Sequence, residues 1–272
     1  MNRNIFKFLA CSICVASAFL YWQDNHIVIT EYKYENEKVP KNFEGFRIVQ
    51  VSDLQNKKFY KNQSSLIKKV KKANPDIIVI TGDIIDANRT NLENAFMFID
   101  KAKSIAPIYY ASGNHENHSD KYDEIIEGLS LRGVHILENK YEHIERNGEK
   151  IAILGLRDIR TSLDFQNALY DMVNENDDYL KILLSHRPEL YYMYDDSGVD
   201  LSFTGHAHGG QIRLPFTDGL FAPNQGFLPK YTSGIRHFEN SSMVISRGLG
   251  NSIFPFRIFN RPEITVTTLY SK

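Results

Sequence analysis

The chain has 272 residues, of which 42% are hydrophobic and 24% charged, and its formal net charge is -1 at pH 7. This composition is typical of a globular protein with a large core and excludes wholesale disorder. The chain carries no basic excess, which argues against binding to the phosphate backbone of nucleic acid. We therefore expect one large domain with a small appendage and no nucleic-acid partner.

The amino-terminal segment, residues 1–23, has the pattern of a membrane helix. Arg3 and Lys7 precede an apolar stretch without charges. Residues 5–22 nearly supply the roughly 20 apolar residues of a spanning helix, provided that Lys7 extends its amine toward the headgroups. Basic residues before a span place that end in the cytoplasm. The segment is thus interpreted as a signal anchor, which holds the protein at the cell membrane by a single pass with its body outside the cytoplasm.

A signal peptide that is cleaved is the alternative, because Ala16-Ser17-Ala18 fits the small-residue cleavage pattern behind a short apolar region. The apolar run continues past this point to Trp22, which favours the anchor. The two cysteines, Cys11 and Cys14, lie inside the same run. We interpret them as apolar filler, because their surroundings lack the polar partners of a redox or metal pair.

The rest of the chain divides into residues 24–45, interpreted as a linker and an early strand around Ile27-Val28-Ile29, and a main domain, residues 46–272. In the main domain, short apolar runs alternate with helical patterns. We expect strands at 47–51, 77–80, 108–111, around 135, 141–144, 151–154, 182–185, 200–204, 211–214, 243–246 and 264–269. Helices are expected at 64–72, 92–103, 122–131 and 165–173. Strands joined by helices pair in parallel, so the order predicts an α/β fold, a four-layer α-β-β-α sandwich of two mixed sheets flanked by helices.

Five polar clusters each follow one of the expected strands. They are Ser52-Asp53-Leu54-Gln55, Thr81-Gly82-Asp83, Ser112-Gly113-Asn114-His115-Glu116, Ser185-His186-Arg187-Pro188 and Gly205-His206-Ala207-His208. Because ligands gather at the carboxyl ends of strands in such sheets, we expect the five loops to meet at one edge. Each cluster alone is more often a turn or a helix cap. The ordered set instead predicts a metal site.

Carboxylate, amide and imidazole groups in this mixture suit two divalent metal ions of the type Mn, Zn, Fe or Mg. Two such cations, about 3.5–4 Å apart, lower the pKa of a shared water and hold the oxygens of an in-line displacement at phosphorus. The residues therefore point to hydrolysis of a phosphate ester.

These clusters resemble the calcineurin-like metallophosphoesterase family, whose pattern is Asp-x-His, Gly-Asp, Gly-Asn-His-Asp/Glu, His and Gly-His-x-His. The resemblance runs from about Phe46 to the end of the chain. Four later stretches are similar to the membrane-anchored bacterial branch, some of whose members act on UDP-diacylglucosamine; they lie at 209–215, 222–226, 246–251 and 260–263. The resemblance implies a metallophosphoesterase domain.

The resemblance also implies roles for single residues. Asp53, Asp83 and His208 would hold the first metal, with Asp83 bridging to the second. Asn114, His186 and His206 would complete the second metal site. His115 would stand over the substrate, to stabilise phosphoryl oxygens or protonate the leaving group, and Glu116 would orient it. The alternative for Glu116 is a plain surface charge.

Gln55 departs from the family pattern, because the family usually has a histidine ligand there. Its amide oxygen can coordinate a metal, but less strongly than imidazole toward zinc-like ions. We therefore expect a hydrolase of phosphodiesters, phosphomonoesters or a lipid-linked pyrophosphate, with a non-catalytic metal-bound binding module on the same fold as the alternative. His115 favours the enzyme, because a scaffold has no need of a histidine that faces the substrate.

Overall fold

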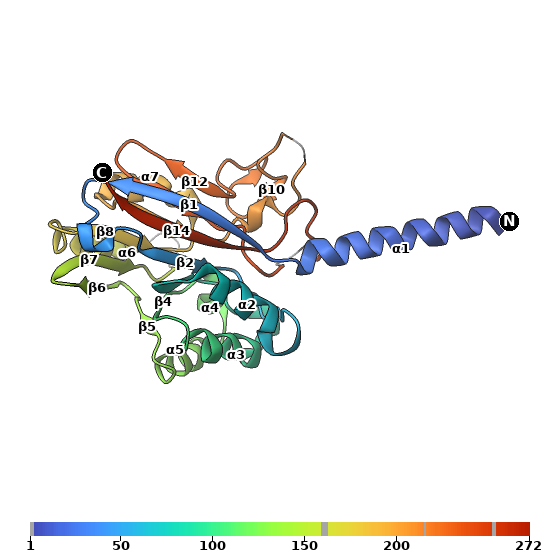
Figure 1. Cartoon of the computed structure of the whole chain (residues 1–272), viewed down its shortest axis with the longest axis horizontal. Helices are drawn as coiled ribbons and strands as arrows, with labels where there is room; N and C mark the ends of the chain where they lie inside the picture. The colour runs from blue at the N-terminus through green and yellow to red at the C-terminus, as the bar shows by residue number, and fades with distance from the viewer. Residues whose placement is uncertain (1–2, 159–162, 215, 252–253) are drawn as a thin grey trace.

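The computed structural model describes residues 3–158, 163–214, 216–251 and 254–272. A long amino-terminal helix, α1 (Arg3–Asn25), projects from a body built on two six-stranded sheets (Figure 1). The first sheet has the order β1-β14-β2-β3-β4-β5, with β1 (Val28–Asn36), β14 (Glu263–Ser271), β2 (Arg47–Val51), β3 (Ile77–Thr81), β4 (Ile108–Ala111) and β5 (His135–Ile136). The second has the order β12-β13-β9-β8-β7-β6, with β12 (Gly234–His237), β13 (Ser242–Ile245), β9 (Leu201–Thr204), β8 (Leu180–Leu184), β7 (Glu149–Gly155) and β6 (Lys140–Arg146).

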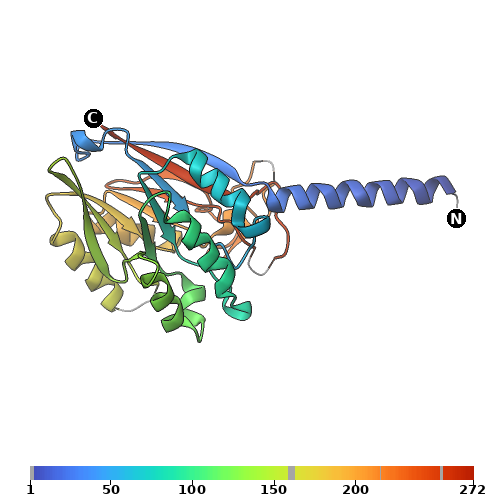
Figure 2. The same cartoon turned by 60° about the horizontal axis from the view of Figure 1, so that its bottom comes forward.

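Helices cover the outer face of each sheet. The first sheet is covered by α2 (Ser64–Ala73), α3 (Leu92–Ala102) and α5 (Tyr122–Ser130), seen on one side of the body in Figure 2. The second sheet is covered by α6 (Leu163–Asn174) and α7 (Tyr191–Ser197). This arrangement confirms the expected four-layer sandwich of two mixed sheets.

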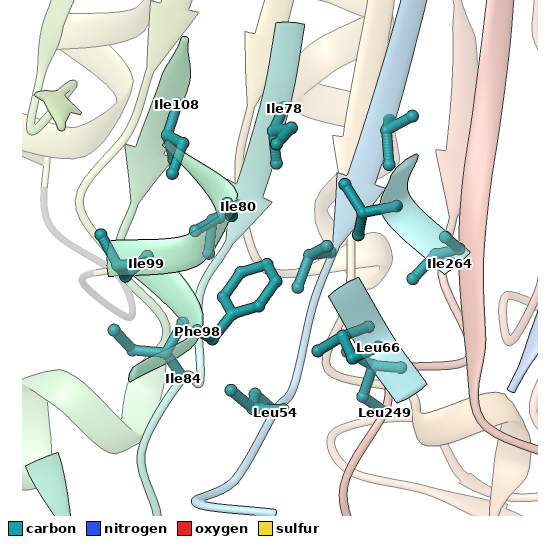
Figure 3. Close-up of a cluster of buried hydrophobic side chains, with 14 of the residues drawn as sticks. Leu54, Leu66, Ile78, Ile80, Ile84, Phe98, Ile99, Ile108, Leu249 and Ile264 are labelled. Carbon is teal, nitrogen blue, oxygen red and sulfur yellow. The ribbon is translucent and has the colours of Figure 1, made fainter. Parts of the chain in front are cut away.

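The alternation along β3 explains why its sequence is apolar throughout. Ile78 and Ile80 pack against the helices, together with Phe98 of α3 (Figure 3). Ile77 and Val79 point the other way, into the core between the two sheets. A strand that is covered on both faces buries every side chain, and β-branched residues suit such a pleated surface.

The edge of the body that carries the polar loops is set by parallel pairing. β2, β3 and β4 are parallel neighbours, as are β7, β8, β9 and β13. Gln50 of β2 joins the two sheets at this edge, because its Nε2 atom donates to Thr81 Oγ1 in the first sheet and to the Thr204 carbonyl oxygen in the second, both at 2.9 Å. The loops that leave the two sheets are thereby held together.

Several parts of the chain differ from the expected elements. Residues 211–214 do not form a strand: Ile212 makes only an isolated bridge to Ile258, and Gln211, with φ of 63°, turns the backbone out of an extended path. The expected early strand is β1, which pairs along its whole length with β14. Part of residues 24–45 is therefore an edge strand of the first sheet. Three strands, β10 (Phe221–Ala222), β11 (Gly226–Phe227) and β12, and two helices, α4 (Asn114–His118) and α7, were not expected.

The helix α1 contains Asn4–Asn25, which among the described helices is the one long and apolar enough to cross a membrane, with a mean hydropathy of 1.8. This is a finding of length and composition, which signal sequences share. Cys11 and Cys14 lie exposed on it and form no disulfide.

Candidate metal centre

Asp53 and Gln55 lie in the loop that follows β2. Both have left-handed backbone conformations, with φ of 52° and 50°. Asp53 Oδ1 accepts a hydrogen bond of 3.1 Å from the backbone N–H of His206 and lies 3.4 Å from Nε2 of His208. Gln55 donates from Nε2 to Asp83 Oδ2 at 2.9 Å. The loop therefore aims one carboxylate and one amide at the edge where the sheets meet.

Asp83 follows β3 and lies at the centre of the cluster. Its Oδ1 atom accepts a 2.9 Å hydrogen bond from the backbone N–H of His115, and its Oδ2 atom lies 3.2 Å from Nε2 of His186. Burial opposes ionisation, but the charge of His186 outweighs it and holds the pKa of Asp83 below its usual range. Gly82, with φ of 83°, permits this packing, because a Cβ atom there would lie 2.4 Å from the backbone nitrogen of Gly113.

Asn114 and His115 begin the short helix α4 (Asn114–His118), directly after β4. Nδ1 of His115 accepts a 3.0 Å hydrogen bond from the backbone N–H of Ala87, so the ring proton lies on Nε2. That Nε2 atom is 3.9 Å from Asp83 Oδ2, and the His115 side chain is 15% exposed. His115 is therefore accessible to a bound molecule, whereas Asp83, 1% exposed, is enclosed.

Glu116 is neither a surface charge nor the residue that orients the His115 ring. Its side chain is fully buried, and Oε2 accepts hydrogen bonds from the backbone N–H groups of Asp83 and Gly113 at 2.8 and 2.7 Å. Oε1 accepts a longer one from Ile85, at 3.3 Å. Burial and the charge of Asp83 raise the pKa of Glu116 to about 8. The expected orienting role is corrected: Glu116 ties the loop after β3 to the loop after β4.

His186 follows β8, and its ring is fixed by the first sheet. Nδ1 donates to the carbonyl oxygen of Thr81 at 2.7 Å, which leaves Nε2 facing Asp83 Oδ2 and His206 Nδ1, each at 3.2 Å. Metal-binding imidazoles typically donate their other N–H in this way. Burial opposes protonation, but the Asp83 carboxylate raises the pKa of His186 to about 10.

His206 and His208 follow β9, with φ of 64° and 47°. Burial and then the charge of His186 lower the pKa of His206 well below its usual value, and burial lowers the pKa of His208. Imidazole binds metals in its neutral form. Both side chains are therefore held in the form that can act as a ligand.

The donor atoms of these loops fall into two groups, Asp53 with Asp83 and His208, and Asp83 with His186 and His206. Within each group the donor atoms all lie within 4.8 Å of one another, and every residue is buried. Asp83 belongs to both groups, as a bridging ligand would. The structure thus brings the expected carboxylate and imidazole ligands together in one cluster, and the expected amide ligands, Gln55 and Asn114, lie beside it.

Four buried atoms of this cluster have no hydrogen-bond partner among the described residues; they are Asp53 Oδ2, Gln55 Oε1, Asn114 Oδ1 and His208 Nδ1. Buried polar atoms of folded proteins rarely lack a partner. Oxygen and nitrogen atoms left unsatisfied around acidic groups are what divalent cations require. The residues therefore fit the two implied cations.

The cluster opens into a cleft of about 930 Å³, whose walls include His115, His118, Arg89, Pro223 and Pro255. The cleft is large enough for a phosphate ester with a substantial organic group.

Two residues beside the second ligand group are absent from the expected ligand set. Arg187 is held by two hydrogen bonds to Asp158, of 2.7 and 2.9 Å, and its Nη1 atom lies 3.4 Å from His206 Nε2. Asn224 Nδ2 lies 3.0 Å from the same nitrogen. Arg187 is next to His186, and Asn224 lies in the stretch 222–226 noted above, so the sequence contained a signal for both.

Arg257 supports the loop that carries Asp53, and no sequence motif marks this residue. It is 1% exposed and donates to the carbonyl oxygen of Gly250. The N–H of Gly250 donates in turn to the carbonyl oxygen of Asp53 at 2.6 Å. A buried guanidinium thus fixes the backbone of the Asp53 loop.

Comparison with known proteins identifies the family of this site. The family model of the calcineurin-like phosphoesterases matches residues 46–210. The chain belongs to this family. This phosphoesterase is 32% identical over 261 residues to the uncharacterized metallophosphoesterase YkuE of Bacillus subtilis, covering 92% of this chain and 88% of that protein. It is 26% identical over 198 residues to the phosphodiesterase YaeI of Escherichia coli, covering 72% of this chain and 70% of that one.

A solved structure shares the fold. The crystal structure of TT1561 of Thermus thermophilus matches with a TM-score of 0.52 at 12% identity, covering 75% of this chain and 90% of that one. Family and donor groups together make the chain a metal-dependent hydrolase of phosphoric esters.

Proposed function

We propose that this phosphoesterase uses a dinuclear metal centre to hydrolyse a phosphodiester or a lipid-linked pyrophosphate. The observation that carries the proposal is the pair of donor groups that share Asp83, with four unsatisfied donor atoms around them. The diester is favoured over a monoester because the relative YaeI is named a phosphodiesterase.

Under this proposal, Asp53, Gln55, Asp83 and His208 hold one cation, and Asp83, Asn114, His186 and His206 hold the other. When bound, the cations would lower the pKa of a water and neutralise charge on the phosphoryl oxygens. The two sheets supply ligands to both sites, so the packing of the body sets their spacing. Arg187 and Asn224 position His206 through its Nε2 atom.

His115 contributes a proton donor. Because its Nδ1 atom is occupied by the Ala87 N–H, its Nε2–H faces the cleft. This N–H can donate to a phosphoryl oxygen or transfer its proton to the oxygen of the leaving group. Either role needs His115 at the substrate and leaves the cations to other residues.

The test pairs Asp83→Asn with His115→Ala in full-length protein purified in detergent. Asp83→Asn should abolish hydrolysis and lower the bound metal measured by elemental analysis, because the shared ligand is weakened. His115→Ala should lower kcat by roughly 10²–10⁴-fold while the metal content stays the same. Substrates are bis-p-nitrophenyl phosphate, p-nitrophenyl phosphate and a nucleotide-sugar lipid, each with Mn, Zn or Mg.

Asp171→Asn, exposed on α6, and His143→Ala, exposed on β6, are the matched controls and should change neither quantity. Full activity and full metal content in Asp83→Asn would contradict the ligand assignment. Loss of metal from His115→Ala would make that residue a ligand. A wild type that binds metal but hydrolyses none of the substrates would favour the binding module.

The span at Asn4–Asn25 motivates a second part of the proposal. We propose that α1 anchors the phosphoesterase to the cell membrane by a single pass and that the body lies outside the cytoplasm. The support is the order of charges, with Arg3 and Lys7 before the apolar run.

A further inference from the structure

The helix α1 leaves the body at the edge that carries the candidate metal centre. α1 ends at Asn25, and β1 begins at Val28, which lies opposite Glu263 at the start of β14. β14 runs antiparallel to β2, with Thr265 opposite Gln50, so the start of β14 lies beside the carboxyl end of β2. The ligand loop follows that end. Figure 1 accordingly shows α1 emerging at the end of the body toward which β2 points.

Two loops at this end expose large apolar side chains, and we call these side chains the aromatic rim. They are Phe216, Phe221, Phe227 and Leu228 in the first loop, and Phe254, Phe256 and Phe259 in the second, between 38% and 108% exposed. Rings of neighbouring rim residues contact each other, with centroids 5.4 Å apart for Phe221 and Phe227. Soluble proteins rarely leave large apolar groups gathered on one surface unless that surface binds something.

Three residues of the aromatic rim have a strained backbone conformation, and their side chains are exposed to solvent. Phe216, Leu228 and Phe259 have φ of 68°, 51° and 52°. This left-handed region is unfavourable for bulky residues, and such strain concentrates at functional sites. Simple core packing explains neither the conformation nor the exposure.

The rim reaches the level of the membrane span. The ring of Phe259 contacts Phe19 of α1 edge to face, with centroids 5.6 Å apart. Phe19 lies three residues before Trp22, so at 1.5 Å per residue it is about 4.5 Å deeper along the helix. Tryptophan prefers the membrane–water interface. With Trp22 at that interface, Phe259 lies at the boundary of the hydrocarbon.

Cationic side chains also lie beside the carboxyl-terminal end of α1. A cavity of about 680 Å³ is lined by Trp22, Lys58 and Lys68, among others. The guanidinium of Arg261 lies 4.7 Å from the centre of the Trp22 ring. Partial burial and the nearby cations, among them Arg261 and Lys68, lower the pKa of Lys69, which places these charges close together. A cluster of cations beside a spanning helix attracts anionic headgroups.

The rim and the cleft share the same two loops. Pro223 of the first loop and Asn251 and Pro255 of the second line the cleft. The second loop is also fixed to the end of α1, because Asp24 Oδ1 accepts from Asn251 Nδ2 at 3.2 Å and from the backbone N–H of Arg257 at 3.0 Å. A surface bound by the rim therefore lies at the mouth of the cleft.

We infer that the aromatic rim rests on the phospholipid bilayer beside α1 and that the cleft opens toward the lipid headgroups. The substrate is then a phosphate ester carried by a membrane lipid, and this part of the inference rests on the proposed function. The contact of the rim with the bilayer itself does not depend on catalysis.

The test of the membrane contact uses the full chain in nanodiscs of phosphatidylglycerol and phosphatidylethanolamine. Cys11→Ser and Cys14→Ser remove the native thiols. An environment-sensitive fluorophore is then attached through Phe227→Cys or Phe256→Cys, or through the controls Leu131→Cys and Tyr192→Cys. The controls are also exposed, at 79% and 58%, but follow α5 or lie on α7, remote from α1.

Nitroxide-labelled lipids should quench the label at the two rim positions much more than at the two controls. Equal quenching at all four positions would overturn the inference. So would rim labels that the lipid quencher fails to reach in discs holding two copies of the chain and that a water-soluble quencher reaches freely in discs holding one copy, because a second copy and not the bilayer would then cover the rim.

The substrate is tested with the pair Phe227→Ser and Phe256→Ser, against Leu131→Ser as control. Hydrolysis of a p-nitrophenyl phosphodiester of diacylglycerol embedded in the nanodisc should fall several-fold in the rim variant. Hydrolysis of water-soluble bis-p-nitrophenyl phosphate should remain at the level of the control, because the metal centre is untouched. Equal changes for both substrates would refute the lipid substrate. If the wild type hydrolyses neither, the proposed function fails, whereas the quenching result stands by itself.

Discussion

At the scale of single residues, we propose that Gln55 determines how the first cation would be held. Its Oε1 atom is buried without a partner in the described part of the chain, so it is free to coordinate. An amide oxygen favours Mn or Mg, whereas the histidine usual in the family favours Zn or Fe. Gln55→His should therefore tighten zinc binding and weaken the dependence of activity on added Mn. Changes around metal ligands alter affinity by about 10–100-fold, which sets the scale.

Titration of Zn and Mn into metal-stripped wild type and variant measures this effect. Gln166→His, exposed on α6, is the matched control. Identical affinities in wild type and Gln55→His would mean that Gln55 does not coordinate and that water takes its place.

The same scale shows what could be predicted from the sequence about the site. Asp53, Asp83, His206 and His208 stand in short motifs at strand ends, and motif and topology together bring them to one place. Arg257 could not be found this way, because it acts on the Asp53 loop, which is distant in the sequence, through its hydrogen bond to the backbone of Gly250. The role expected for Glu116 was wrong for the same reason: its three backbone partners are visible only in the fold.

At the scale of elements, Glu116 makes the short helix α4 a clamp between two ligand loops. Three buried N–H groups depend on its carboxylate. In Glu116→Gln the amide offers one acceptor oxygen in place of two, which leaves at least one of these donors poorly satisfied. The expected loss of stability is about 1–3 kcal/mol. Thermal unfolding in the presence of a chelator measures it without interference from metal loss, and Glu127→Gln, exposed on α5, is the control. An unchanged midpoint would show that the clamp is unnecessary.

The elements themselves were predicted well where burial dictates the pattern. Strands covered on both faces, such as β3, are continuous apolar runs, and the helices show one apolar stripe. The strand predicted at 211–214 was wrong. Polar and apolar residues alternate there as in a strand, but Gln211 adopts a left-handed conformation that only the surrounding loops impose. The strands β10 and β11 are too short to leave a periodic signal.

At the scale of the whole molecule, the proposed position of the body outside the cytoplasm rests on charge. Arg3 and Lys7 lie before the span, and basic residues are retained on the cytoplasmic side. Protease added to spheroplasts should therefore digest the body while cytoplasmic marker proteins survive. In the variant Arg3→Glu with Lys7→Glu, part of the population should become protected. Complete protection of the wild type would place the body in the cytoplasm.

The boundary between the two sheets has a consequence for the life of the protein in the cell. Asp53 and Asp83 come from one sheet and His186, His206 and His208 from the other, and Gln50 is one of the residues that join the two sheets directly. Each bound cation would be coordinated by residues of both sheets and would hold them together. A ligand that binds only the folded state stabilises that state by mass action. Loss of the metal ions would then lower the stability of the folded protein as well as abolish its activity. Supply of the ions would set how much of the protein survives quality-control proteases.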